Sequence, residues 1–317
     1  MAVCISDINI VTAPRKSRTS TRTLENHSLF LTMPAIPFAI DAHHHLWRYS
    51  AVEYPWIDDR MAALRRDFLP ADFIGELAIA GITGAVTVQA RQTLEETQWL
   101  LELAARHNEI LGVVGWAPIA SPHFENLLNT LSANQKLVAL RHVVQAEPQG
   151  FLDIEDFNRG IRTLRQTGLV YDLLLFEHQL AEAIRFVDCH PQQVFVLDHI
   201  AKPKIAAGEL EPWRTQIHEL SKRSNVCCKI SGMVTEASWS HWSIGSLRPY
   251  LDTVVDAFGA NRLLAGSDWP VCLVAASYLQ WWQVLRDYFA DFSDDERANI
   301  FGATAARIYN LKMGSHE

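Results

Sequence analysis

The most regular feature of the chain is an alternation between short apolar runs and longer amphipathic runs that begins near residue 36. The apolar runs are rich in Val, Ile and Leu and show little polar alternation, which is typical of parallel strands buried on both faces. The pattern predicts eight strands, at residues 38–41, 85–89, 111–116, 138–144, 169–174, 194–198, 226–230 and 262–265.

Helical periodicity fills the intervals between these runs. Segment 93–107 carries Leu and Ala on one side and Glu elsewhere, and its Thr93-x-x-Glu96 start predicts a capping box. Strands that alternate with helices over about 270 residues predict an α/β fold with a single (β/α)8 TIM barrel. The further helices are expected at residues 153–167, 179–189, 247–258, 294–301 and 304–309.

The ends of the chain lack this alternation. Segment 14–28 is basic and rich in hydroxyl side chains. It loosely resembles a transit peptide, but a flexible tail or a start codon placed too far upstream is the favoured interpretation. We therefore expect a flexible N-terminal extension at residues 1–35, the barrel at residues 36–312 and a short tail at residues 313–317.

Composition narrows the class of protein. The 317 residues are 49% apolar and 20% charged, which is ordinary for a soluble globular domain. Lys and Arg number 28 against 36 Asp and Glu, a net charge of −8 that argues against a nucleic-acid-binding protein. No apolar run is long enough to span a bilayer, and the five cysteines form no CxxC motif. We expect a cytoplasmic protein with reduced thiols, no nucleic-acid or membrane partner, and a monomeric or homodimeric state.

The strongest local signal is a run of histidines at the end of the first predicted strand, Asp41-Ala42-His43-His44-His45. Residues i and i+2 of a strand share a face, so His43 and His45 are expected to point together toward the barrel axis. Two imidazoles on one face can bind a divalent metal or polarise a carbonyl group. Active sites of this fold lie at the C-terminal ends of the strands, and we interpret both residues as functional.

Two other strand ends carry chemistry of the same kind. His199 follows the sixth predicted strand, and Asp268 follows the eighth. A carboxylate at the barrel mouth can deprotonate a water or bind a metal, although an Asp after a strand can also cap a helix. Arg141, at the end of the fourth strand, can clamp a carboxylate or a lactone carbonyl. Weaker polar candidates, which could equally satisfy the barrel interior, are Gln89, Asp172, Lys229 and Ser231.

Aromatic residues are concentrated near the same end of the predicted barrel. Segment 46–71 interrupts the alternation directly after the first strand and contains Trp47 and Trp56. It is expected to form either a lid or substrate wall or a satellite apolar cluster beneath a long loop. We predict that Trp47, Trp56 and Trp269 contact the substrate ring.

The strings IDAHHHLW, VLDHIAKP, GSDWPV and ATAARIYNL occur in this order along the chain. Together they resemble the lactonase group of the amidohydrolase superfamily, which includes L-fuconolactonase, L-rhamnonolactonase and pyrone dicarboxylate lactonase. The resemblance covers residues 36–312. It implies a hydrolase that opens a small polar lactone, either sugar-derived or a dicarboxylate lactone, as in carbohydrate or aromatic acid catabolism.

The resemblance also implies roles for individual residues. His43 and His45 match the family HxH, His199 matches the strand-six His, and Asp268 matches the Asp that serves as general base. Arg141 matches an Arg that contacts substrate. Lys229, Gln89 and the three Trp residues are further candidates for substrate binding.

Two departures from the wider superfamily bear on metal binding. The fourth strand offers Arg141 where binuclear members place a carboxylated Lys or a Glu, and the fifth strand offers no His. A single Zn held by His43, His45 and Asp268 is one expectation, and metal-independent catalysis is favoured over it. The alternative reaction is metal-dependent, non-oxidative decarboxylation of an aromatic or muconate-like acid.

Overall fold

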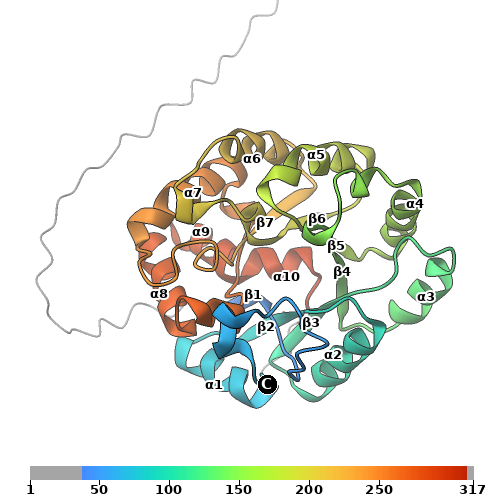
Figure 1. Ribbon diagram of the computed structural model, residues 1–317, viewed down its shortest axis with the longest axis horizontal. Helices are drawn as coiled ribbons and strands as arrows, with labels where there is room; N and C mark the ends of the chain where they lie inside the picture. The colour runs from blue at the N-terminus through green and yellow to red at the C-terminus, as the bar shows by residue number, and fades with distance from the viewer. Residues whose placement is uncertain (1–37, 313–317) are drawn as a thin grey trace, which may run out of the picture. The chain divides into compact units, whose positions relative to one another are not determined.

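Eight parallel strands hydrogen-bond in sequence order from β1 to β8 in the computed structural model, which describes residues 38–312 (Figure 1). Each predicted apolar run overlaps a strand, and the predicted TIM barrel is confirmed. The first strand lies later than predicted and includes His43 and His44. The strands are β1 (Ile40–His44), β2 (Gly84–Val88), β3 (Ile110–Gly115), β4 (Leu137–Val143), β5 (Val170–Leu174), β6 (Phe195–Leu197), β7 (Val226–Ile230) and β8 (Leu263–Ala265).

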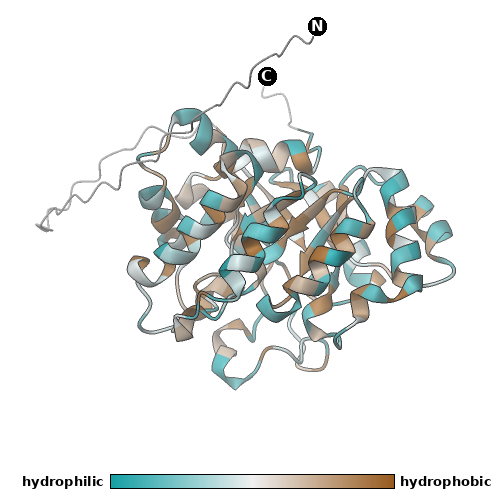
Figure 2. Ribbon diagram, turned by 90° about the horizontal axis from the view of Figure 1, so that it is seen from above, coloured by the Kyte–Doolittle hydropathy of each residue, from teal (hydrophilic) through white to brown (hydrophobic). Residues whose placement is uncertain are grey.

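Helices surround the strands, with apolar strands inside and polar helix faces outside (Figure 2). The sequence pattern did not identify α1, α3, α6 or α8; α3 and α6 have only eight and nine residues, too few turns to establish a period. The helices are α1 (Pro70–Ala80), α2 (Leu94–Arg106), α3 (Phe124–Leu131), α4 (Glu155–Leu164), α5 (Leu180–Cys189), α6 (Trp213–Ser221), α7 (Ile244–Phe258), α8 (Tyr278–Tyr288), α9 (Asp294–Ala298) and α10 (Thr304–Ile308).

The predicted capping box of α2 is only half formed. The Thr93 hydroxyl accepts from the Glu96 backbone N–H at 3.1 Å, as expected. The Glu96 carboxylate turns away from Thr93 and accepts instead from the backbone N–H groups of Ala90 and Arg91 at 2.9 and 2.8 Å. The buried carboxylate therefore holds the loop that follows β2, because these donors lack another partner at the strand end.

The barrel interior is apolar at one end and polar at the other. Side chains from the strands form a buried cluster that α10 joins through Ala305 and Tyr309. A second, larger cluster lies between the strands and the outer helices. Trp47 and Tyr54 belong to this larger cluster, so part of the 46–71 segment packs directly into the main core.

The barrel closes where β8 meets β1. The Asp268 N–H donates to the His43 carbonyl at 2.8 Å, and the His45 N–H donates to the Trp269 carbonyl at 2.6 Å. The two strands approach so closely at Gly266 that a β-carbon there would lie 2.9 Å from the His43 β-carbon. A side chain at this position would push the strands apart, which explains the need for glycine.

A buried carboxylate reinforces this closure. Asp41 of β1 accepts from the Ser267 backbone N–H at 2.8 Å and from its hydroxyl at 2.5 Å. It also accepts from the His43 N–H at 3.1 Å and the Tyr278 hydroxyl at 3.1 Å. One side chain thus ties β1 to the β8 loop and to α8, and burial raises its pKa to about 6.

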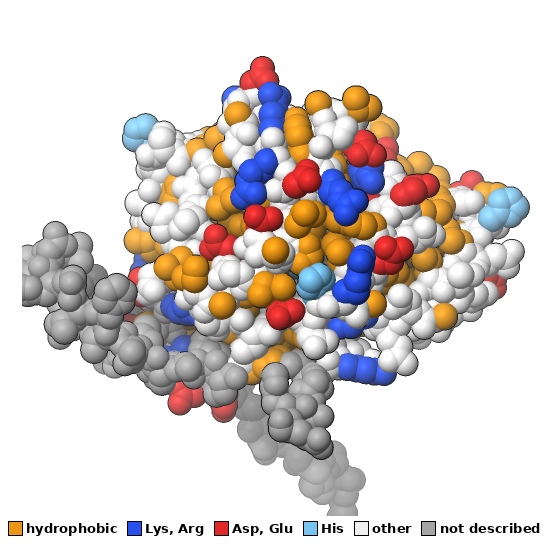
Figure 3. All heavy atoms as spheres, turned by 90° about the horizontal axis from the view of Figure 1, so that it is seen from below, with side chains coloured by type: hydrophobic (Ala, Val, Ile, Leu, Met, Phe, Trp, Pro, Cys, Tyr) orange, Lys and Arg blue, Asp and Glu red, His pale blue; other side chains and the backbone are white. Residues whose placement is uncertain are grey.

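The structure describes neither end of the chain. The predicted extension at residues 1–35 and the tail at residues 313–317 lie outside the described residues. Within the described part, no helix is long and apolar enough to cross a membrane. Cys189, Cys227, Cys228 and Cys272 are free thiols. On the face in Figure 3, basic and acidic side chains are interspersed.

We expect Asp41→Ala to destabilise the protein by about 3 kcal/mol or more, because it leaves several buried donors without an acceptor. Tyr278→Phe removes only one of the four hydrogen bonds and should cost about 1 kcal/mol. Urea unfolding monitored by circular dichroism measures both. Equal losses for the two variants would contradict the central role given to the carboxylate.

Candidate active site

The HxH pair forms the centre of a polar cluster at the C-terminal end of the strands. The Nε2 atoms of His43 and His45 lie 3.2 Å apart, so the two rings do point together as predicted. His44 points away, where it stacks on Phe73 and contacts the Thr87 hydroxyl. These placements follow from the alternation of side chains along β1.

The backbone fixes the orientation of His45. Its Nδ1 lies 2.8 Å from the carbonyl of Val88, at the end of β2. A carbonyl oxygen only accepts, so Nδ1 donates in this contact and Nε2 is the ring atom directed toward the cluster.

Asp268 and His199 complete the cluster from the opposite side. Asp268 Oδ1 lies 3.3 Å from His45 Nε2, 3.8 Å from His43 Nε2 and 3.9 Å from His199 Nε2. His45 and Asp268 are each 5% exposed, and His199 is 3% exposed. The three predicted strand ends therefore converge at one nearly buried cluster around the Asp268 carboxylate.

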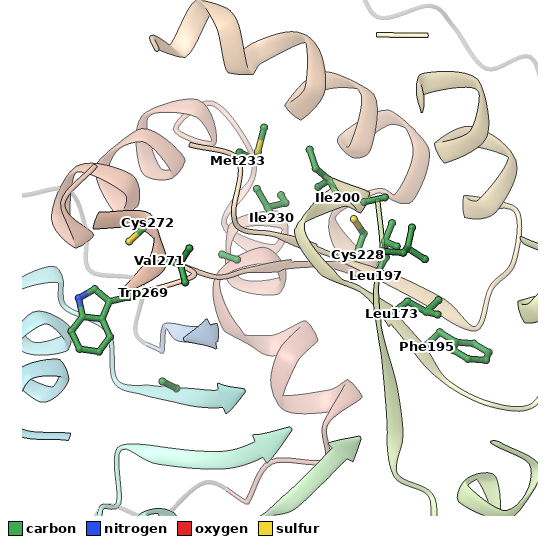
Figure 4. Packing of buried hydrophobic residues seen from close by; sticks show 14 of the residues in the cluster. Leu173, Phe195, Leu197, Ile200, Cys228, Ile230, Met233, Trp269, Val271 and Cys272 are labelled. Atoms are coloured by element: carbon green, nitrogen blue, oxygen red, sulfur yellow. The ribbon is translucent and has the colours of Figure 1, made fainter. Parts of the chain in front are cut away.

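Strained backbone holds two of these residues in place. His199, Ile200, Ala201 and Lys202 all have positive φ, between 46° and 62°, and Asp268 has φ 58°. Non-glycine residues in this region cost about 1 kcal/mol or more each, and such residues cluster at functional sites. Around the first four residues, the fold compensates by burying Ile200 in the apolar cluster of Figure 4 and by bonding its carbonyl to the Trp213 indole N–H at 2.7 Å.

The ring of His199 is also positioned by β7. Its Nδ1 lies 2.9 Å from the Ser231 hydroxyl. A β-carbon at Gly232 would lie 2.6 Å from the same nitrogen, and Gly232 has φ 65°. The close approach of backbone to imidazole directs Nε2 of His199 toward Asp268.

Four buried charges lie beside the histidines. Arg141 Nη1 donates to Asp198 Oδ2 at 2.9 Å. Lys229 Nζ lies 3.0 Å from Asp198 Oδ1 and donates to Asp172 Oδ2 at 2.6 Å. Two cations and two carboxylates sum to zero, which offsets the cost of burying each one.

The electrostatics keep His43 and His199 neutral and the carboxylate of Asp268 ionised. Burial lowers the pKa of His43 well below its usual value and lowers that of His199 to about 4. Burial by itself raises the pKa of Asp268, but the adjacent His199 and His45 outweigh it and the pKa is lowered. At neutral pH the cluster therefore combines the neutral rings of His43 and His199 with one carboxylate.

The donor set fits a single divalent cation. His43, His45 and Asp268 form one group of ligand atoms within 4.8 Å of one another. His45 Nε2 lies 3.3 Å from the Asp268 oxygen, and a ring nitrogen and a carboxylate oxygen this close need a shared proton or a cation between them. Imidazole nitrogens and a carboxylate oxygen are ordinary zinc ligands.

The other predicted site residues differ in how close they lie to the cluster and in how much of each side chain is exposed. Arg141 is 3% exposed and borders the cluster, whereas Gln89 is fully buried and donates to the Arg141 carbonyl at 3.4 Å. Trp47 and Trp269 are packed into the core, with 0% and 1% exposed. Trp56 is 40% exposed and its ring meets Trp47 edge-on, so of the three it offers by far the most surface to a ligand.

Two positioning residues were not identified from the sequence. Asp41 lies two residues before His43, and the sequence pattern gives it no role of its own. Tyr309, from the C-terminal end of α10, donates to both Asp172 oxygens, at 3.0 and 2.9 Å. No spacing rule links Tyr309 to residues 137 positions earlier.

Among the described residues, β5 contributes no histidine to the cluster. Asp172 points inward from β5 to Lys229. His178, which follows the strand, has a side chain that is 67% exposed and lies beside Glu177. The strand-five ligand that the decarboxylase alternative requires is therefore not supplied by this strand.

Known proteins match most of the chain. L-fucono-1,5-lactonase of Burkholderia multivorans is 41% identical over 285 residues, which cover 86% of this chain and 96% of that protein. L-fucono-1,5-lactonase of Burkholderia ambifaria is 34% identical over 285 residues, which cover 88% and 97%.

Structural similarity agrees with these matches. The crystal structure of a Burkholderia multivorans amidohydrolase with bound zinc is 38% identical in sequence, with a TM-score of 0.82, and the match covers 87% of this chain and all of that one. A family model described as amidohydrolase matches residues 40–311. The predicted superfamily is confirmed, and the chain belongs to the amidohydrolase family.

Proposed function

We propose that the protein hydrolyses a small sugar lactone, with L-fucono-1,5-lactone as the first candidate. The observation that carries the proposal is the convergence of His43, His45 and His199 on the Asp268 carboxylate in a nearly enclosed site. Ester hydrolysis needs an ionised base for water and donors for a developing oxyanion, and this cluster supplies both.

Substrate identity rests on the relatives. The two Burkholderia proteins that cover most of this chain both carry the name L-fucono-1,5-lactonase. The site is lined by polar and charged side chains, as a sugar lactone requires. Arg141 at its border offers guanidinium N–H groups that can bind a hydroxyl or the lactone carbonyl.

In the mechanism we propose, the Asp268 carboxylate holds the attacking water, and His45 Nε2, 3.3 Å from Asp268 Oδ1, positions that carboxylate. As the water oxygen bonds to the lactone carbonyl carbon, Asp268 takes its proton. The ring C–O bond then breaks, and Asp268 returns the proton to the leaving ring oxygen.

The remaining imidazoles stabilise the carbonyl oxygen. His43 and His199 are neutral, and each can present an N–H at Nε2. Donors fixed in advance around a developing oxyanion supply a large share of catalysis in acyl transfer. A divalent cation bound by His43, His45 and Asp268 would polarise the same carbonyl; we propose that turnover does not depend on it.

Asp268→Asn should lower kcat for lactone hydrolysis by about 10²- to 10⁴-fold, the range typical of a lost general base. The assay follows acid release from L-fucono-1,5-lactone in weak buffer with a pH indicator. Asp256→Asn, at an exposed position of α7, is the matched control and should keep normal activity. Near-normal turnover by Asp268→Asn would remove the proposed base.

The pH dependence follows from the lowered pKa of Asp268. The active form is ionised, so its activity is present above that pKa and is lost only as the pH falls through it, below 3.8. We expect kcat/KM to show no acid-side decline between about pH 5 and pH 8. Circular dichroism at each pH separates unfolding from titration, and a decline centred near pH 6 would point to another base.

Removal of divalent cations tests the metal-independent mechanism. We expect the protein to keep most of its lactonase activity after dialysis against a chelator, with residual zinc measured by mass spectrometry. Added zinc then restores nothing further. Complete loss on chelation, reversed by zinc, would assign the carbonyl polarisation to the cation instead.

A further inference from the structure

A cavity lies beside the aromatic segment that follows β1, outside the polar cluster of the candidate active site. Its volume is about 230 Å³, below the roughly 300–1,000 Å³ of pockets for drug-sized ligands, so it suits a smaller molecule. None of its lining residues belongs to the cluster around Asp268, so a ligand here would bind apart from the reacting groups. The cavity is lined by Arg48, Glu53, Tyr54, Arg91 and Trp99.

Aromatic side chains separate this cavity from the HxH pair. Tyr54 packs against Trp47 with ring centroids 5.8 Å apart, and the Trp47 ring in turn lies 6.4 Å from the His45 ring. Trp47 is fully buried between them. The cavity and the cluster are therefore neighbouring but distinct sites.

The guanidinium of Arg48 supplies one positive charge to the cavity. It lies over the Trp99 ring, 5.8 Å from the ring centroid. In the described part of the chain, the Arg48 side chain makes neither an ion pair nor a hydrogen bond. Its N–H groups therefore have no acceptor in the protein and can donate to a bound anion.

Arg91 supplies the second positive charge. Its Nη1 donates to Glu53, and its guanidinium lies 5.7 Å from the centroid of the Tyr54 ring. Its Nε is buried without a hydrogen-bond acceptor among the described residues, since the Glu96 carboxylate is 3.9 Å away. Arg91 is thus held in place by one carboxylate and still has donor groups to offer.

The other lining groups decide which kind of anion fits. The half-exposed Glu53 carboxylate repels a dianion such as phosphate, but its oxygens can accept hydrogen bonds from hydroxyl groups. The Tyr54 hydroxyl donates to Glu96 at 3.2 Å, which leaves the Tyr54 ring to face the cavity beside the Trp99 ring. A molecule with one carboxylate, several hydroxyls and a face of C–H groups complements all of these features.

We propose that this cavity binds a small polyhydroxy carboxylate, with its carboxylate on Arg48 and Arg91 and its hydroxyls on Glu53. Arginine and carboxylate form strong, charge-assisted hydrogen bonds. The ring-opened acid that lactone hydrolysis releases belongs to this class, so the choice of probe, though not the site, rests on the proposed function. Arg48 follows β1 and Arg91 follows β2, so the ligand joins two loops at the C-terminal end of the barrel.

Isothermal titration calorimetry of the full chain with L-fuconate, the acid formed from L-fucono-1,5-lactone, gives the first readout. Arg48 is exposed, so Arg48→Gln should fold normally. We expect it to weaken binding at this cavity by roughly 10-fold, the effect of losing one hydrogen bond between charged groups. Arg106→Gln is the matched control: it removes the same charge from the exposed last turn of α2, and L-fuconate should bind it as it binds the wild-type protein.

The second readout locates the ligand, from spectra of protein labelled with ¹⁵N-tryptophan. The indole N–H signals of Trp99 and Trp56 are assigned by their loss in Trp99→Phe and Trp56→Phe. We expect L-fuconate to shift the Trp99 signal in the wild-type protein and to shift it far less in Arg48→Gln at the same concentration. A shift of the Trp56 signal without any shift of the Trp99 signal would place the ligand at the catalytic cluster alone and overturn the proposal.

Acetate and inorganic phosphate test the class of ligand through the same Trp99 signal. We expect both to bind more weakly than L-fuconate, because acetate lacks hydroxyl groups and Glu53 repels the second charge of phosphate. Glu53→Gln should therefore bring phosphate closer to L-fuconate in affinity. Equal affinity of the wild-type protein for all three would mean an adventitious ion only, and would overturn the proposal.

Unchanged affinity for L-fuconate in Arg48→Gln would also overturn it. Failure of the wild-type protein to hydrolyse any lactone has a different meaning. It would contradict the proposed function, whereas the calorimetry and the Trp99 signal would still decide whether the cavity binds a polyhydroxy carboxylate.

Discussion

The site depends on the closure of the barrel between β1 and β8. The Asp41 carboxylate joins the two strands, and backbone hydrogen bonds at His43 and His45 align their ends. Without this closure, the HxH pair and Asp268 would lie at opposite edges of an open sheet. Because the register is fixed by buried hydrogen bonds in an apolar setting, the separation of these groups is fixed with it.

A second constraint is the balance of buried charge. Arg141 and Lys229 offset Asp172 and Asp198, so neutral histidines can lie beside four ionised groups without a large net field. Breaking a buried pair leaves an uncompensated charge, which costs far more than the pair contributes. The same arrangement gives His43 neighbours of both kinds, an ammonium and a carboxylate, at one nitrogen.

At His199 and Asp268 the fold adopts a destabilising left-handed backbone in order to place functional side chains. Both residues adopt φ values that ordinary side chains avoid, and both direct their side chains into the cluster. Burial of Ile200 and the hydrogen bond from Trp213 to its carbonyl hold the first of these turns. In the family to which this chain belongs, such strain suits a site whose groups must be fixed before substrate arrives.

The sequence by itself determined the eight strands. It also predicted that His43, His45, His199 and Asp268 lie together at the ends of the strands. Buried strand runs and polar residues at strand ends are local patterns, and local patterns can be recognised from the sequence without the tertiary structure. Short helices such as α3 and α6 were not predicted, because two turns are too short to show a helical period. The tertiary structure alone decided which polar residues touch. It moved Trp47 and Trp269 into the core, turned Glu96 from its helix cap to a loop, and brought Tyr309 to Asp172 across the barrel. Contacts between residues so distant in the chain arise from packing, which no spacing in the sequence encodes.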